Sequence, residues 1–313
     1  MPRLRYLLYP GLIGYAIFCY LLAPASVLHL AWVNVLWMLA PLVLLPLAFY
    51  VDRRPLPIYA WAASTGLLAG AFLLPPGLAA ALLALPYLLF TVYTGWTALD
   101  RLTTWRTAEV VRLAGWLYLS VAAFWAFADR LDWQPLGFDP VIVLLTAAHF
   151  HYAGLLLPLL TGLVIQDRPG RLANAIGWLV VIGVPLVAFG LTASQFGVPH
   201  WLEQLAVLVM IAGGAGSAYL HLIAAGYGPH RNARKLFFLG SACLLSGMLL
   251  ALAYNFRALL PWPFLDIPHM YALHGTLNTI GVGVLLLGGW VLRVRSSDYH
   301  VTTASVPEAQ IST

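Results

Sequence analysis

The sequence contains very little charge. Only 9% of its 313 residues are Asp, Glu, Lys or Arg, whereas 62% are hydrophobic, and the mean hydropathy is +0.86. An ordinary soluble domain carries about 25% charged residues, so this class is excluded. In such a chain the net charge of +5 is better explained by membrane topology than by nucleic acid, and no nucleic-acid partner is expected. The composition predicts an all-α polytopic membrane protein whose first partner is the lipid bilayer.

Cysteine is almost absent. Cys19 and Cys243 are the only two, and both lie inside apolar runs. This excludes a disulfide framework and a thiolate metal cluster. Any bound metal or cofactor must therefore rely on histidine or oxygen ligands.

Long apolar runs are abundant, and a spanning helix needs about 20 such residues. They predict about ten transmembrane helices in a single bundle over residues 1–295, with a motif-bearing core at about 139–293. The polar residues 296–313 are predicted to be a disordered cytoplasmic tail. The predicted spans are 5–23, 28–50, 57–74, 77–98, 107–128, 139–165, 173–194, 201–226, 234–257 and 267–293.

The basic residues indicate the orientation, because short cytoplasmic loops collect Lys and Arg. Those near the N-terminus and after the even-numbered spans are Arg3, Arg5, Arg53, Arg54, Arg101, Arg106, Arg112, Arg168, Arg171, Arg231, Arg234, Lys235, Arg293 and Arg295. The odd-numbered spans are followed only by Arg130 and Arg257. We therefore expect a multi-pass protein of the bacterial cytoplasmic (inner) membrane with both termini in the cytoplasm.

Local signals refine these spans. Asp139-Pro140 and Asp266-Ile267-Pro268 are typical of helix starts. The first apolar run, which ends near Ala23-Pro24-Ala25, fits either a first spanning helix or a cleaved signal peptide. Small residues on two spans predict close helix packing; they are Gly213, Gly214, Gly216 and Ser217, and Gly281, Gly283, Gly288 and Gly289.

Ionisable side chains at membrane depth are costly and usually mark a site or a partner. His149 and His151 fall near mid-membrane, while His274 lies about 10 Å below the outer start of its helix, with Tyr271 and Asn278 one turn away on either side. Together with residues at the outer ends of other spans they predict a polar pocket in the outer half of the membrane. The other residues expected at this pocket are Tyr152, Glu203, Tyr254, Asn255 and Arg257.

The pair His149 and His151 has a particular geometry. Residues two apart on a helix point about 200° away from one another, so one ion cannot easily bind both. Three arrangements remain: two cofactors flanking the helix, one ligand with one orienting partner, or two hydrogen bonds to neighbouring helices. His221 lies deeper on its span and is expected to make an ordinary interhelical hydrogen bond, and His269 is close to the outer surface.

The segment Ala147-Ala148-His149-Phe150-His151-Tyr152 resembles the helix of haem-copper oxidase subunit I that carries a His-Phe-His element. The resemblance implies haem ligands on opposite sides of one helix. This sequence has no His-His pair, no His-x-x-x-Tyr element and no histidine deep in its second span, so an oxygen reductase is not expected.

A second resemblance covers more of the chain. The run from Thr146 to Gly162, with His149-Phe150-His151-Tyr152 at its centre, is similar to the signature helix of the YndJ-like bacterial membrane proteins, and His274-Gly275-Thr276-Leu277-Asn278-Thr279-Ile280-Gly281 resembles that family's His-Gly-x-x-Asn-x-x-Gly element. It spans roughly residues 140 to 290. Members of this family are named mostly as transporters or as uncharacterised proteins.

These observations leave four hypotheses. The leading one is a redox or gas-sensing protein that binds haem b or copper through His149 or His151 together with His274, with a redox partner. The second is a metal-free enzyme that isomerises, cyclises or hydrolyses a lipophilic small molecule. Its catalytic groups would be the three histidines and Asn278, and its substrate-binding residues Tyr152, Glu203, Tyr254, Asn255, Arg257 and Tyr271. The third is a small-molecule transporter, and the fourth is that these side chains only hold helices together.

Overall fold

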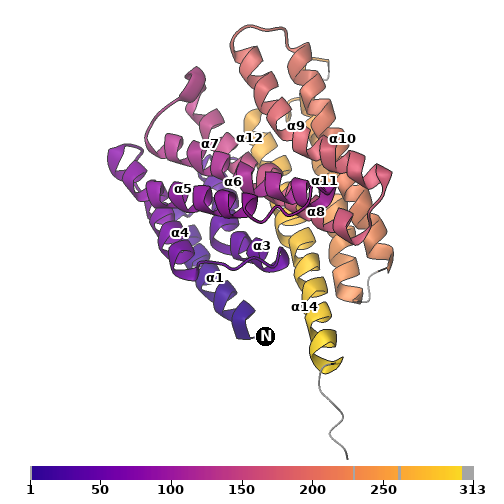
Figure 1. Ribbon diagram of the computed structural model, residues 1–313. Helices are drawn as coiled ribbons and strands as arrows, with labels where there is room; N and C mark the ends of the chain where they lie inside the picture. The colour runs from indigo at the N-terminus through magenta and orange to yellow at the C-terminus, as the bar shows by residue number, and fades with distance from the viewer. Residues whose placement is uncertain (1, 228–229, 260–261, 305–313) are drawn as a thin grey trace, which may run out of the picture.

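The computed structural model describes residues 2–227, 230–259 and 262–304, and over these residues it is helical without any strand (Figure 1). Eight helical spans are long and apolar enough to cross a membrane. Two shorter apolar helices, Leu8–Leu22 and Ile58–Leu73, occupy the first and third predicted positions. The expected polytopic helical fold is therefore confirmed, with eight full-length spans and two shorter helices.

Each predicted span corresponds to one helix or to a short series of helical segments. The uninterrupted helices are α1 (Pro2–Leu22), α4 (Ile58–Leu73), α5 (Leu78–Leu99), α6 (Thr107–Arg130), α9 (Arg171–Gln195), α10 (Trp201–Tyr227) and α11 (Arg231–Asn255). The second, sixth and tenth spans are built from several segments each. The second span consists of α2 (Ala31–Leu39), η1 (Ala40–Leu44) and α3 (Leu45–Val51). The sixth consists of α7 (Pro140–His149), η3 (Phe150–Leu156) and α8 (Leu157–Asp167). The tenth consists of α12 (Ile267–Met270), η4 (Tyr271–Gly275), α13 (Thr276–Asn278), η5 (Thr279–Leu286) and α14 (Leu287–Ala304).

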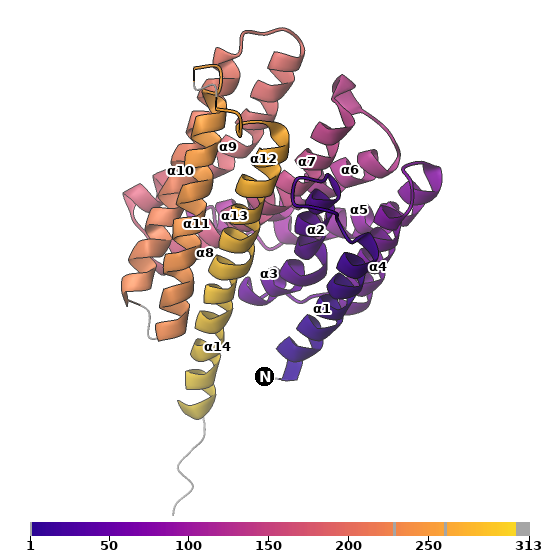
Figure 2. The same cartoon turned by 180° about the vertical axis from the view of Figure 1, so that it is seen from behind.

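The C-terminal end differs from the prediction of a disordered tail after residue 295. Helix α14 continues to Ala304, because a helix already formed in the membrane adds further residues at little cost. Residues 305–313 lie outside the described residues. In Figures 1 and 2 the start of α1 and the end of α14 lie at the same end of the molecule, as two termini on one side of a membrane require.

Both predicted helix starts are confirmed. A carboxylate oxygen of Asp139 accepts a hydrogen bond from the backbone N–H of Val141 at 2.9 Å, with Pro140 in the first helical position. Asp266 accepts from the backbone N–H of His269 at 2.9 Å in the same way. Each carboxylate satisfies an N–H that has no partner within its own helix.

Helix α1 belongs to the bundle. It packs against α2, η1, α3 and α4. The hydroxyl of Tyr15 donates to the carbonyl of Val35 at 3.0 Å, and a Cβ on Gly11 would collide with the carbonyl oxygen of Leu42. These contacts make α1 part of the packed bundle.

Among the described residues, π-helical segments occur only in the second, sixth and tenth spans. The three spans meet one another: η3 packs on η5, η1 on η5, and α2 on both α7 and η4. A π segment breaks the regular hydrogen-bond ladder and is frequent at functional sites. The histidines predicted to form a site lie on two of these three spans.

The second span has backbone carbonyls that side chains from other spans satisfy. The indole N–H of Trp61 donates to the carbonyl of Pro41 at 2.9 Å, and the hydroxyl of Tyr152 donates to that of Leu36 at 2.5 Å. Prolines at 41 and 46 remove two N–H groups from this span. Because hydrocarbon offers no hydrogen bonds, these aromatic donors stabilise the irregular backbone.

The small residues pack as predicted. A Cβ on Gly213 would lie 2.9 Å from the backbone nitrogen of Val180, and one on Gly216 would lie 2.7 Å from the side chain of Ile176. On the tenth span a Cβ on Gly281 would lie 2.5 Å from Cβ of Cys243. Glycine at these positions therefore lets α10 approach α9, and η5 approach α11.

Contacts between connections agree with the predicted alternation of sides. At one side the backbone N–H of Gly77 donates to the carbonyl of Arg130 at 2.7 Å, which joins the α4–α5 connection to the end of α6. At the other side Arg293 donates to both carboxylate oxygens of Asp167 at 2.9 Å, which joins α14 to the end of α8. We call the first side, with the connections 74–77, 131–139 and 196–200, the outer side in keeping with the basic-residue pattern.

Arg130 is one of the two basic residues on this outer side, and the structure explains it. Its guanidinium donates to the carbonyls of Ala71 and Leu74 at 3.4 and 3.3 Å, pairs with Asp129 at 2.6 Å, and lies 4.0 Å from the ring centroid of Phe72. The residue is 7% exposed. Arg130 therefore satisfies carbonyl groups at the C-terminal end of α4 and stabilises the fold.

We expect Arg130→Ala to destabilise the protein by about 2–3 kcal/mol, because buried carbonyls and Asp129 lose a charged partner. Thermal unfolding in mild detergent should show a melting temperature lowered by roughly 5 °C. Arg257→Ala is the matched control, since that exposed arginine donates only to the carbonyl of Tyr254 in its own turn. An equal effect of both substitutions would contradict this role for Arg130.

Candidate functional site

The two histidines of the sixth span have different environments. His151 is 1% exposed, whereas the side chain of His149, two residues earlier, is exposed. Helix α7 ends at His149 and the π segment begins at Phe150. The expected divergence of the two rings is therefore present, because the two side chains differ in exposure.

His151 is held by aromatic residues of two other spans. The indole N–H of Trp37 donates to Nδ1 at 2.8 Å, and the hydroxyl of Tyr87 lies 2.9 Å from Nε2. Nδ1 also lies 2.7 Å from the carbonyl oxygen of Ala147. In one tautomer Nδ1 accepts from Trp37 and Nε2 donates to Tyr87; in the other Nδ1 donates to Ala147 and Nε2 accepts from Tyr87. In either case both ring nitrogens are engaged by the protein.

His149 has the opposite character. It makes no hydrogen bond to any other residue in the part of the chain that the structure describes, and it lies close enough to His274 for the two rings to interact electrostatically. The ring of His149 is thus exposed and lies near an imidazole of the tenth span.

His274, on η4, contributes the second imidazole. Its Nδ1–H donates to the carbonyl of Gly247 on α11 at 2.9 Å. In the neutral ring this bond leaves Nε2 as a lone-pair acceptor. Asn278 donates from Nδ2 to the carbonyl of His274 at 2.8 Å, and a Cβ on Gly247 would lie 3.0 Å from that Nδ2. Gly247 therefore lets both polar side chains of the tenth span approach α11.

Two tyrosines expected at the pocket act on the second span. The hydroxyl of Tyr152 donates to the carbonyl of Leu36, and that of Tyr271 donates to the carbonyl of Leu28. Both tyrosines are 8% exposed. Tyr152 is thereby bonded to backbone of the second span, and Tyr271 to backbone of the turn that precedes it, so the two tyrosines fix this part of the chain against the sixth and tenth spans.

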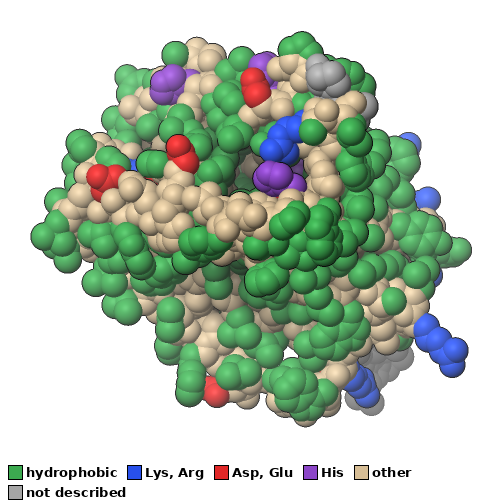
Figure 3. All heavy atoms as spheres, turned by 90° about the horizontal axis from the view of Figure 1, so that it is seen from above, with side chains coloured by type: hydrophobic (Ala, Val, Ile, Leu, Met, Phe, Trp, Pro, Cys, Tyr) green, Lys and Arg blue, Asp and Glu red, His purple; other side chains and the backbone are tan. Residues whose placement is uncertain are grey.

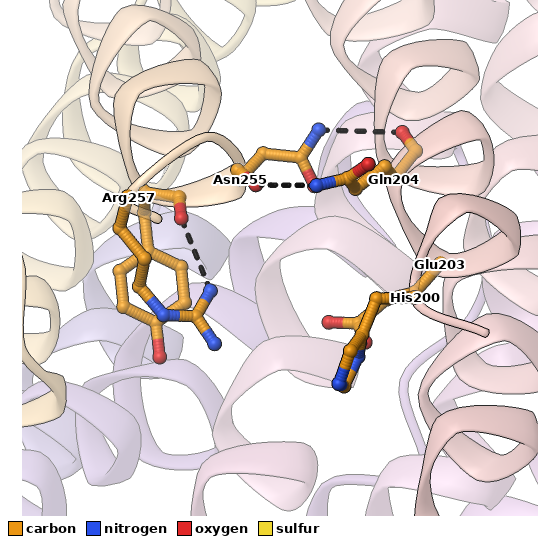
Figure 4. A network of polar contacts seen from close by, with 6 residues as sticks. His200, Glu203, Gln204, Asn255 and Arg257 are labelled. Carbon is orange, nitrogen blue, oxygen red and sulfur yellow. Dashed lines mark hydrogen bonds and ion pairs between the residues drawn. The ribbon is translucent and has the colours of Figure 1, made fainter. Parts of the chain in front are cut away.

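The other expected pocket residues lie at the outer ends of α10 and α11 (Figure 4). The amide of Asn255 donates to the carbonyl of Gln204 at 3.3 Å, and the amide of Gln204 donates to the carbonyl of Asn255 at 3.4 Å. Nδ1 of His200 lies 3.5 Å from a carboxylate oxygen of Glu203. In Figure 4 the side chains of His200 and Arg257 lie on the same side of the reciprocal amide bridge.

Arg257 is positioned by its own turn. Its guanidinium lies 4.2 Å from the ring centroid of Tyr254 and donates to that residue's carbonyl at 3.1 Å. The arginine is exposed, and Tyr254 is partly buried beneath it. This pair places a positive charge at the outer end of α11.

The outer end of the molecule is hollowed. Figure 3, which looks down on it, shows a depression near the centre in which a histidine and a basic side chain lie side by side, with acidic side chains around the rim. Other charged side chains and histidines lie farther out, toward the edges of this face.

His221 makes the interhelical hydrogen bond that the sequence predicts. It is 0% exposed, Nδ1–H donates to the carbonyl of Ser217 at 2.8 Å, and Nε2 accepts from the indole N–H of Trp290 at 3.1 Å. The bond joins α10 to α14. His269 is more exposed and its Nδ1 lies 2.7 Å from the carboxylate of Asp266.

Sequence reasoning missed the residues that complete these contacts: Trp37, Tyr87, Gln204, His200 and Gly247. Trp37 and Tyr87 are 0% exposed and lie in apolar runs. Buried tryptophan and tyrosine side chains usually need a hydrogen-bond partner, so the sequence indicates that Trp37 and Tyr87 bind some polar group. The sequence does not indicate which histidine each of them binds.

The donor set can be compared with what a metal needs. Among the described residues no group of three or more His, Cys, Asp or Glu side chains could hold a metal ion. The two neighbouring imidazoles, His149 and His274, remain as potential donors. Neither nitrogen of His151 has a lone pair free for a second cofactor on the other side of the helix.

These spans, with polar side chains confined to a few positions, define an all-helical polytopic integral membrane protein. The model of the YndJ-like protein family matches residues 35–282, and the chain belongs to this family. The resemblance seen in two sequence motifs is thus confirmed over most of the chain.

One relative is the uncharacterized membrane protein YndJ of Bacillus subtilis (strain 168), which is 32% identical over 216 residues. The alignment covers 66% of this chain and 38% of that protein, so this chain matches well under half of its relative's length. No solved structure matches the chain.

Proposed function

We propose that this protein binds a lipophilic small molecule in the outer half of a bacterial cytoplasmic membrane and acts on it by proton transfer between His149, His274 and the bound molecule. The observation that carries the proposal is that two imidazoles from different spans lie near one another, and that His149 is exposed without a protein hydrogen bond. A polar ring at membrane depth is costly unless something satisfies it.

The surroundings favour an apolar ligand with one polar group. The two spans that carry these histidines have a mean hydropathy of 1.6. The outer face is hollowed near its centre (Figure 3), and the histidine and the basic side chain in this hollow would attract a polar or anionic head. Asn278, beside His274, would orient the polar group.

His274 is hydrogen-bonded in the tautomer that a general base requires. Because Nδ1–H donates to Gly247, the neutral ring presents Nε2 as the basic nitrogen. That nitrogen would take a proton from the bound molecule and return it at another atom, while the N–H of His149 stabilises the negative charge that develops between the two steps. An isomerisation or cyclisation of this kind needs no net proton uptake.

His149→Ala and His274→Ala should each weaken the binding of a co-purifying ligand about tenfold, because each deletes a hydrogen-bonding group and leaves a polar group of the ligand unsatisfied. The measurement is organic extraction and mass spectrometry of protein purified in mild detergent. His269→Ala is the control, since this partly exposed histidine of the same span has Asp266 as its polar partner among the described residues. Unchanged ligand in the two site variants would refute the proposal.

Copper is a second candidate at the same two side chains. A histidine that donates Nδ1–H to a carbonyl and presents Nε2 has the arrangement usual for metal-binding imidazoles. Two imidazoles with an external ligand would suit copper. Elemental analysis decides: about one copper per chain that both His149→Ala and His274→Ala abolish would favour it over the metal-free reading. Haem held through both His149 and His151 does not fit, because His151 is bonded to Trp37 and Tyr87.

A further inference from the structure

A second pocket, of about 200 Å³, lies on the side opposite the histidines, where the connections 52–57 and 100–106 meet α6. Three arginines line it: Arg54, Arg101 and Arg112. Its two acidic residues are Asp52 and Glu109. The pocket is unrelated to the outer-side histidines.

Both acidic groups already have partners. Asp52 accepts from Arg112 at 2.9 Å and from the indole N–H of Trp116 at 2.8 Å. Glu109 accepts from the backbone N–H of Thr104 at 3.1 Å. Because Asp52 and Arg112 neutralise each other, the other charged residues of the pocket are Arg54, Arg101 and Glu109, which together carry a net positive charge.

Arg54 is fixed in place and incompletely satisfied. Its Nη2 donates to the carbonyl of Thr94 and to the hydroxyl of Thr97, both at 2.9 Å, and its guanidinium carbon lies 4.3 Å from the ring centroid of Trp116. Its Nη1 is buried and has no hydrogen-bond partner. A buried guanidinium nitrogen without a hydrogen-bond acceptor costs free energy. An acceptor from outside the chain would remove this cost on binding.

Electrostatics agrees with this geometry. Burial lowers the pKa of Arg54 to about 10; the charge of Asp52 opposes the change, and the charge of Arg101 adds to it. The guanidinium is thus protonated at neutral pH but destabilised by burial and by a like charge. A negative ligand between Arg54 and Arg101 would relieve both effects.

We infer that this inner-side pocket binds a phosphate group, held by the Nη1 of Arg54 and the guanidinium of Arg101. Guanidinium donors match phosphate oxygens well. Since a water molecule occupies about 30 Å³ in the liquid, the pocket has room for a phosphate and its ester substituent. Basic pockets between spanning helices on the cytoplasmic side are suited to anionic lipid heads, and the phosphate could also be a free anion.

Exposed aromatic residues nearby favour the lipid source. Trp105 is 83% exposed and Trp96 is 65% exposed, and both lie close in sequence to the pocket. Such side chains prefer the level of the lipid headgroups. They place the opening of the pocket where a phospholipid could enter from the bilayer.

The test is thermal unfolding of the full chain in an uncharged detergent, with added inorganic phosphate, short-chain phosphatidylglycerol or short-chain phosphatidylcholine. A ligand of the folded state raises the melting temperature as its concentration rises, which yields a dissociation constant. We expect Arg101→Gln and Arg54→Gln to weaken binding about tenfold or more. Arg106→Gln, an exposed arginine of the same connection that does not line the pocket, should leave it unchanged.

Stabilisation by phosphatidylglycerol alone would identify a lipid head as the ligand, and stabilisation by inorganic phosphate would identify a free anion; both outcomes support the pocket. No stabilisation by any of the three would overturn the inference, as would stabilisation that Arg101→Gln leaves intact. The Arg101→Gln arm remains decisive if Arg54→Gln fails to fold, because Arg101 is exposed. Ligand extraction from the outer-side pocket is measured separately, so either proposal can fail alone.

Discussion

His151→Ala should lower the melting temperature of the purified protein by about 5–10 °C, while His149→Ala should leave it within about 1–2 °C of the parent. The two histidines are only two residues apart on one span. Removing His151 leaves the N–H of Trp37 and the hydroxyl of Tyr87 without a partner inside the bundle, and it creates a cavity. Removing His149 breaks no hydrogen bond to any described residue.

The measurement is thermal unfolding in mild detergent, followed by intrinsic fluorescence and by aggregation. His151→Gln serves as a partial rescue, because its amide can accept from Trp37 and still reach a hydroxyl. Equal losses of stability in the alanine variants of His149 and His151 would mean that both rings only hold helices together. The expected contrast separates a structural histidine from one available to a ligand.

Gly213→Leu should destabilise the pair α9 and α10 by about 3 kcal/mol or prevent accumulation of folded protein. A Cβ at this position would already lie 2.9–3.2 Å from three backbone atoms, which belong to Val180 and Leu179. Backbone atoms of a packed helix cannot rotate away as a side chain can. The two helices must therefore separate and lose the contacts along their common surface.

Gly226→Leu is the matched control for this substitution. Gly226 lies on the same helix, is exposed, and would meet nothing within 4 Å of an added Cβ. Its replacement should leave the melting temperature unchanged or raise it slightly, because leucine is the better helix former. Comparable destabilisation by both changes would show that the close approach of α9 and α10 is not the cause.

The spans were predictable because hydrophobic length reports directly on the membrane. The starts of α7 and α12 were also predictable, since an aspartate before a proline satisfies local N–H groups whatever the rest of the fold does. The glycines of α10 indicated close packing for the same local reason: only the absence of a side chain matters there. His221 needed only a donor on a neighbouring helix, and Trp290 supplies it.

The roles of His149 and His151 were not predictable. Their spacing shows that the two rings diverge, but it does not show which ring meets Trp37 and Tyr87 and which one faces open space. That choice depends on how the second and fourth spans, which carry Trp37 and Tyr87, pack against the sixth. The π segment beginning at Phe150 also changes the direction of the following side chains, and no local feature of the sequence predicts this segment.

For the inner-side arginines, too, the sequence predicts one property and the tertiary structure decides another. Their positions predict the topology, because short cytoplasmic loops collect Lys and Arg. Only the packing of the connection 52–57 against α5 and α6 leaves Nη1 of Arg54 buried beside Arg101 without a partner.

The sequence by itself thus determined a polytopic helical bundle and its spans, because these depend on length, hydropathy and local capping. The tertiary structure alone decided that His151 is hydrogen-bonded and that His149 has no hydrogen bond to any described residue. A hydrogen bond between spans depends on distances that no periodicity within one span contains. The tertiary structure decided in the same way that arginines of two connections and of α6 line one pocket.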